Sequence, residues 1–69
     1  MSIVAVQSTT LVAMAYDVDQ QMLQLEFRDR SVYRYFGVPA NLYQDLLDAP
    51  SKGKYFNRFI RERFAYVRS

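Results

Sequence analysis

The sequence predicts an α+β domain in which a three-stranded antiparallel meander is followed by two helices packed on one face, in the order βββαα. Two observations support this fold. Before Gly37, an apolar run at Leu11–Tyr16 is followed by alternating side chains in residues 22–27 and by aromatic residues that alternate with others in residues 32–36, as in strands. After Gly37 and Pro39, apolar residues instead recur at the spacing of amphipathic helices.

We expect residues 1–69 to form a single domain, with residues 1–10 as a loose lead-in, because a chain of this length has no room for a second core. The hydrophobic content of 51% includes six tyrosines and five phenylalanines, which supply that core. Cysteine and histidine are absent, which excludes disulfides, Cys/His zinc sites, and thiol or imidazole catalysis.

The sequence predicts neither a membrane span nor a signal peptide. No run approaches the ~18 apolar residues that a membrane helix needs. The first eight residues hold no basic residue and too short an apolar run for a secretory signal. A chain without cysteine is compatible with a reducing compartment, and we expect a cytoplasmic protein.

Three strands are expected in the first half of the chain. They cover Leu11–Tyr16, Met22–Phe27, and a segment that starts at Val32 and stops before Gly37. Alternation is clearest in the middle strand, where every second residue is a large apolar one. A four-residue loop between the first two strands gives the pairs Tyr16–Leu23, Met14–Leu25 and Val12–Phe27.

The turn between the second and third strands decides which side chains are buried. A three-residue loop ending at Arg30 pairs Leu25 with Tyr33 and Leu23 with Tyr35. This register puts both tyrosines on the buried face, whereas a two-residue turn would exchange the two faces of the strand. We expect the three-residue loop, although Arg30 must then adopt a left-handed backbone at a cost on the order of 1 kcal/mol.

Two helices are expected after the strands. Pro39 suits the first helical position, and Pro50 ends this helix near Asp48. Ser51 is an N-cap for the second helix, which we expect to fade over residues 61–63. The expected buried faces are Leu42, Tyr43, Leu46 and Leu47 in the first helix, and Tyr55, Phe56, Phe59 and Ile60 in the second.

Positive charge is concentrated in the second part of the chain. All nine basic residues lie from Arg28 onward, against four acidic ones there. Lys54, Arg58 and Arg61 are four and three residues apart, so they form one line on the second helix, here called the basic stripe. Such a distribution indicates an anionic partner, although a merely solvated basic face is the alternative.

The start of the second helix, Ser51-Lys52-Gly53-Lys54, is a further candidate site. Free backbone N–H groups beside two ammonium groups suit a phosphate. The alternative is simple capping by Ser51, with Gly53 allowing close packing. The candidate anion-binding residues are therefore Lys52, Gly53, Lys54, Arg58, Arg61 and, from the third strand, Arg34.

The two faces of the expected sheet suggest different roles. Tyr33 and Tyr35 point towards the helices, where we expect core tyrosines rather than residues that stack on bases. The opposite face carries Met22, Val32 and Phe36, which make it a candidate homodimer interface. Phe36 beside a cation could alternatively stack a base.

Catalytic groups are few. Asp45 and Asp48 lie three residues apart on a helix surface, where no cleft is expected to raise either pKa. Asp17-Val18-Asp19 lacks the glycine and the distal glutamate of a calcium loop. We expect no enzyme activity, no metal and no cofactor.

The segment Val32-Tyr33-Arg34-Tyr35-Phe36-Gly37-Val38-Pro39 resembles the central YxY signature of the KTSC domain family. Tyr55, Phe56 and Asn57 also match the pattern of that family, and the resemblance extends from about Ser8 to Tyr66. Arg30 departs from it, because the family usually has glycine there. The resemblance implies a small bacterial domain, found alone or at the C-terminus of some lysyl-tRNA synthetases, for which RNA binding has been suggested.

Together these observations predict a small non-enzymatic module that binds RNA or another polyanion through its basic second helix. The alternative is a protein-interaction or homodimerisation module that uses the open sheet face. The salt dependence of binding distinguishes the two hypotheses, because polyanion binding must weaken as the salt concentration rises and apolar association should not.

Overall fold

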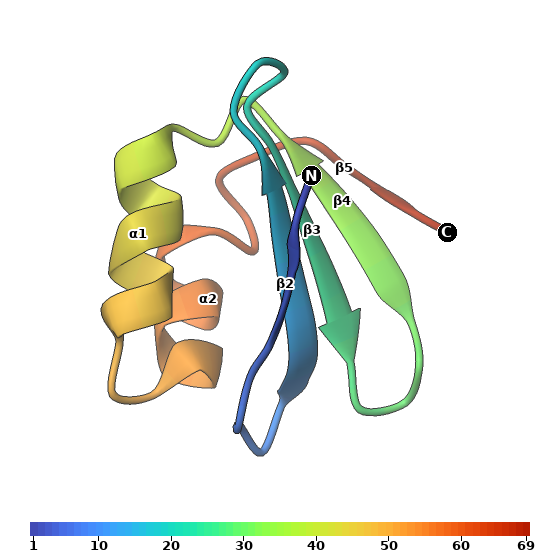
Figure 1. The fold of residues 1–69 in the computed structure, drawn as a ribbon, viewed down its shortest axis with the longest axis vertical. Helices are drawn as coiled ribbons and strands as arrows, with labels where there is room; N and C mark the ends of the chain where they lie inside the picture. Colours follow the sequence, from blue (N-terminus) through green and yellow to red (C-terminus); the bar gives the residue numbers. More distant parts are fainter.

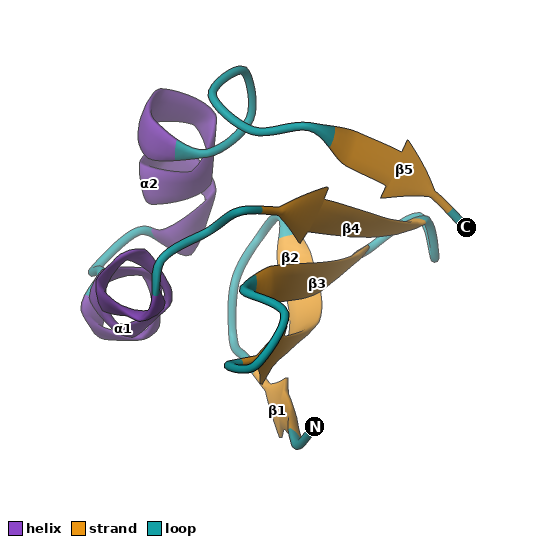
Figure 2. Ribbon diagram, turned by 90° about the horizontal axis from the view of Figure 1, so that it is seen from above, coloured by secondary structure: helices purple, strands orange, loops and turns teal.

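The computed structural model describes residues 1–69 and has two helices packed on one face of a five-stranded antiparallel sheet (Figures 1 and 2). The expected α+β class and the two helices are confirmed. The sheet order follows the chain, β1-β2-β3-β4-β5. The elements are β1 (Ile3–Ala5), β2 (Leu11–Asp17), β3 (Met22–Phe27), β4 (Val32–Phe36), α1 (Ala40–Asp48), α2 (Lys52–Phe59) and β5 (Tyr66–Arg68).

The expectation of three strands was wrong, because two short edge strands flank the meander. Residues 1–10 are not a loose lead-in: β1 pairs with β2 and places Ile3 opposite Ala15. After α2 the chain returns along β4, so that Tyr66 lies opposite Tyr35. Strands of three residues take their hydrogen bonds from a distant partner, so their own sequence carries little periodic signal.

The pairing of β2 with β3 agrees with the prediction at Tyr16–Leu23 and Met14–Leu25 but not at Val12–Phe27. A bulge between Leu11 and Ala13 moves the register, and Leu11 lies opposite Phe27 instead. Leu11 is fully buried as a result, whereas Val12 is exposed.

The pairing of β3 with β4 confirms the predicted register, with Leu25 opposite Tyr33 and Leu23 opposite Tyr35. Arg30 has a φ of 72°, the left-handed backbone that the three-residue loop requires. Asp29 secures this turn, because its carboxylate accepts hydrogen bonds from the Ser31 amide and hydroxyl. These donors hold the pKa of Asp29 below its usual value.

The helix boundaries differ from the prediction by one or two residues. Pro39 is the N-cap of α1 rather than its first helical residue. Ser51 caps α2 as predicted, and its hydroxyl accepts the Lys54 amide at 3.4 Å. α2 ends at Phe59, before residues 61–63, because the backbone leaves helical geometry at the fully buried Ile60.

The core lies between the helices and the sheet. Tyr16 contributes to the edge of the core, since its hydroxyl donates to the Val38 carbonyl and its ring stacks on Tyr43. The nine residues of the central cluster are Leu11, Met14, Leu23, Leu25, Tyr35, Val38, Leu46, Phe56 and Ile60.

No helix has the length and apolar character needed to cross a membrane.

Replacing Arg30 by glycine should stabilise the domain by up to about 1 kcal/mol, because glycine has no Cβ to strain the left-handed backbone. The matched control is Gly37→Ala. Gly37 has a φ of 77° and no heavy atom near an added Cβ, so alanine there should destabilise through backbone strain alone. Urea unfolding measures the change in the free energy of unfolding for both variants. Clear destabilisation by Arg30→Gly would show that the backbone of Arg30 is not strained.

Candidate functional site

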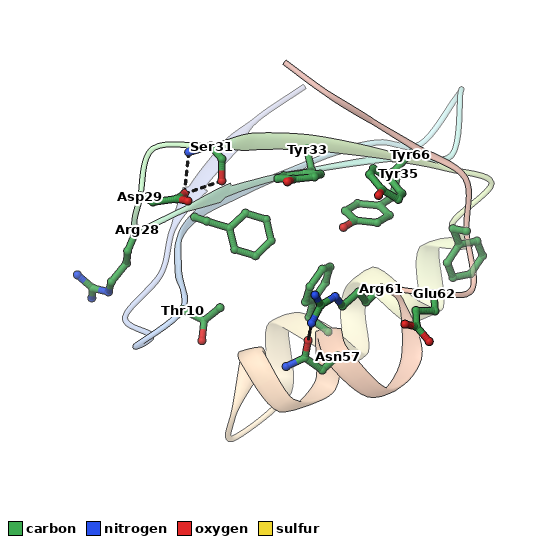
Figure 3. A pocket seen from close by; sticks show the side chains of 13 residues that line it. Thr10, Arg28, Asp29, Ser31, Tyr33, Tyr35, Asn57, Arg61, Glu62 and Tyr66 are labelled. Carbon is green, nitrogen blue, oxygen red and sulfur yellow. Dashed lines mark hydrogen bonds between the residues drawn. The ribbon is translucent and has the colours of Figure 1, made fainter.

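A groove with a volume of about 770 Å³ opens between α2 and the sheet face that the helices cover (Figure 3). β4 supplies Tyr33 and Tyr35, and β5 supplies Tyr66. α2 supplies Phe56, and Phe27 lies at the end of β3. We call the space lined by these five rings the aromatic groove.

The five rings form one connected cluster. Tyr33 and Tyr35 stack with their ring centres 6.3 Å apart, and Tyr66 lies 5.6 Å from the first and 5.4 Å from the second. Phe56 contacts Tyr35 edge-on at 5.5 Å, while Phe27 contacts Tyr33 at the same distance. Packing of this kind fixes each ring, so the groove wall is preformed.

The tyrosines of the groove differ in how much they are exposed. Tyr35 is 3% exposed and Tyr66 is 54% exposed. No buried side-chain nitrogen or oxygen atom lacks a hydrogen-bond partner. The hydroxyls of Tyr33 and Tyr35 make no hydrogen bond within the chain, so they are not fully shielded from solvent. Burial, with smaller effects of the neighbouring tyrosines, raises the pKa of Tyr35 to about 12.

Three arginines, here called the groove arginines, come from three different parts of the chain; Arg28 and Arg61 line the groove, and Arg68 lies beside it against Tyr33. Arg28 lies in the turn after β3, and its Nε donates to the Ser8 carbonyl at 2.8 Å. Arg61 follows α2 and donates to the Asn57 side-chain oxygen at 3.3 Å. The guanidinium of Arg68 on β5 lies 5.7 Å from the ring centre of Tyr33, in cation–π contact.

Two carboxylates also line the groove and limit where an anion can lie. Asp29 is at the end next to Ser31, where it is held in its turn. Glu62 is next to Arg61 in the chain. An anionic ligand is thus expected near Arg61 and Asn57 rather than at the Asp29 end.

The basic stripe meets the groove at Arg61. Lys54 and Arg58 are exposed on α2, and the Arg58 guanidinium lies 5.4 Å from the Phe59 ring centre. Asn57 lies between these two cations in the sequence and lines the groove. The end of α2 at Phe59 therefore turns one member of the stripe towards the tyrosines.

The start of α2 packs closely against the loop before β2. Gly53 is buried, and a Cβ there would lie 2.6 Å from the hydroxyl oxygen of Thr10. Lys52 is directed back to the Ala49 carbonyl at 3.2 Å. Lys52 and Gly53, which were predicted to bind an anion, therefore do not line the aromatic groove.

The structure places Arg34 on the other side of the sheet, here called the outer face. Its Nε donates to the Gln24 side chain at 3.1 Å, so it is not brought together with the basic stripe. Of the suggested interface residues on this face, Met22 is 8% exposed and Phe36 is 40% exposed. Val32 is half-buried, and only Phe36 offers a large apolar surface.

The residues of the resemblance are divided between core and groove. Tyr33 and Tyr35 point inward as predicted; Tyr33 is half-buried, and Phe56 is buried against Tyr35. Asn57 lines the groove, whereas the Tyr55 ring packs 4.7 Å from Phe59 outside it. Burial and the nearby Asp45 raise the pKa of Tyr55.

Sequence reasoning missed the contributions of Arg28 and Tyr66 to the site. Both depend on β5 returning to β4 and on the turn after β3, which bring distant segments together. The alternation of Tyr66-Val67-Arg68 was the only available signal, and it is short.

Known proteins resemble this chain over most of its length. The family model described as the KTSC domain matches residues 7–64. A Stutzerimonas stutzeri protein described as uncharacterized is 41% identical over 66 residues, which cover 94% of this chain and 93% of that protein. A crystal structure of a KTSC domain protein from Yersinia pestis matches with a TM-score of 0.95 at 32% identity, covering 99% of this chain and 96% of that one.

A segment of a larger protein is also similar. The lysine–tRNA ligase of Nostoc punctiforme is 46% identical over 52 residues, which are 75% of this chain but 9% of the ligase. The similarity is thus to a small part of the ligase.

The raised pKa of Tyr35 predicts a loss of stability in alkali. The folded chain holds this proton more tightly than an unfolded chain, in which tyrosine has a pKa of about 10. The stabilisation that comes from protonated Tyr35 should be fully present below pH ~10. It should be lost as the pH rises towards 12. Tyr35→Phe should remove this part of the decline in a series of melting temperatures, whereas parallel curves for the two proteins would contradict the assignment.

Proposed function

The chain belongs to the KTSC domain family, and on that premise we propose that it is a non-enzymatic module that binds single-stranded RNA or another polyanion. The observation that supports this proposal is the position of Arg61, which belongs to the basic stripe and is also one of the groove arginines. Polyanion binding needs several cations along one path, and this surface offers them from α2, the turn after β3, and β5.

The hydrogen bonds that Arg28 and Arg61 make do not neutralise their positive charges. Arg28 donates to a backbone carbonyl, and Arg61 donates to a side-chain amide. Both acceptors are neutral, so each arginine keeps its full charge for a phosphate. The Arg68 guanidinium lies over the Tyr33 ring and also interacts with the Asp29 carboxylate, whose pKa it helps to lower, so Arg68 is less free for a phosphate than Arg28 and Arg61.

The lysine–tRNA ligase segment supports RNA as the polyanion. That relative is named a lysine–tRNA ligase, and 52 of its residues match this chain at 46% identity. We infer that this chain also uses its basic surface on RNA. Contacts to phosphates carry no sequence information, so little sequence preference is expected from the basic stripe.

Changing Lys54, Arg58 and Arg61 together to glutamate should abolish binding of short single-stranded RNA in fluorescence anisotropy. The wild-type affinity should be micromolar or weaker at physiological salt and should fall with log salt by roughly 0.7 per phosphate contact. The melting temperature should stay near wild type, because all three side chains are exposed.

The matched control compares Arg61→Glu with Arg34→Glu. Each substitution changes the net charge equally, but Arg34 lies on the outer face with Gln24. Only Arg61→Glu should weaken RNA binding. Equal losses in both variants would show that general charge, not this surface, attracts the RNA.

A second candidate function is self-association through the outer face, and the exposed apolar side chains there favour it. Ile3 is 71% exposed and Val67 is 50% exposed, in addition to Phe36. β1 and β5 thus extend an uncovered apolar surface at both edges of the sheet.

If this face forms a homodimer, sedimentation should show concentration-dependent association that Phe36→Glu abolishes without unfolding the domain. Phe36→Leu, which keeps an apolar side chain, is the control and should retain association. A monomer at high concentration for the wild type would eliminate this candidate.

A further inference from the structure

We propose that the aromatic groove binds one unpaired nucleobase of the single-stranded RNA, with the phosphate next to that base held by Arg61. This inference rests on the proposed function and adds a site that contacts a base as well as the backbone. Its chemical class of ligand is a flat heteroaromatic ring joined to a phosphate.

The ring surface for stacking is preformed and partly open. Tyr66 keeps 54% of its surface exposed while it lies 5.6 Å from Tyr33 and 5.4 Å from Tyr35. The Tyr66 ring is tilted by 47° and 35° to those two rings, so it is not stacked flat on either and can offer a face to a ligand. Aromatic side chains held in this way stack on any base, because every base has a π-face.

Two guanidinium groups lie near the tyrosine rings of the groove. Arg61 lines the groove opposite the tyrosines, and Figure 3 shows its guanidinium on the α2 side, bonded to Asn57. Arg68 covers Tyr33 at 5.7 Å. A base against the tyrosines therefore has guanidinium groups on two sides, which is the charge arrangement that a nucleotide complements.

Polar groups at the groove can meet the edge of the base. Asn57 uses its side-chain oxygen to accept from Arg61, so its amide N–H groups remain free to donate. The hydroxyls of Tyr33 and Tyr35 reach the same space. A volume of about 770 Å³ lies within the range of roughly 300–1,000 Å³ that small-ligand pockets have.

The experiment compares two labelled probes in anisotropy titrations: a short oligouridylate, and an abasic oligomer of the same length and charge. Wild type should bind the oligouridylate about tenfold more tightly, because only this probe can stack. Tyr66→Leu should reduce its affinity to that of the abasic probe without changing the salt dependence. Tyr66→Phe, which keeps the ring, should bind like wild type.

Phe36→Leu is the matched control, since it also removes an exposed aromatic ring but from the outer face. Melting temperatures verify that each variant is folded. The chain has no tryptophan, so quenching of tyrosine emission by the oligouridylate gives a second readout of stacking.

The outcomes separate this inference from the proposed function. Equal affinity of wild type for the two probes, with no effect of Tyr66→Leu, would overturn the base site while leaving polyanion binding intact. Absence of binding by either probe at low salt would overturn both. Loss of oligouridylate binding in Phe36→Leu but not in Tyr66→Leu would place the base on the outer face and reject the groove.

Discussion

The register of β3 with β4 is the constraint on which the rest of the structure depends. Leu25 opposite Tyr33 and Leu23 opposite Tyr35 put two tyrosines on the face that the helices cover. A slip of one residue would move both to the outer face and bring Arg34 into the core. The strained backbone of Arg30 is accepted because burying the alternating apolar side chains is worth more than the local cost.

The same register creates the candidate site. Once Tyr35 faces inward, β5 can pair with β4 and bring Tyr66 beside it, which completes the aromatic wall. α2 then ends at Phe59, so the last turn of the helix leaves part of this wall uncovered and directs Arg61 to it. One set of rings thus both packs against the core and lines the groove.

Local pattern predicted much of this fold. Alternation in residues 22–27 and the turn before Ser31 were sufficient for the central register, and the Ser51 cap followed from its residue type. β1, β5 and the bulge near Val12 were not predicted, because they depend on partners far away in the chain. For the same reason the basic stripe could be derived from helical spacing, whereas the aromatic groove required the structure.

The central claim is that the basic stripe and the aromatic groove form one RNA-binding surface, and an amide chemical-shift titration with a short single-stranded RNA tests it most directly. The account predicts shifts concentrated at Tyr33, Tyr66, Asn57 and Arg61, with smaller ones along α2. Shifts confined to Ile3, Phe36 and Val67 on the outer face, or no shifts at low salt, would contradict it.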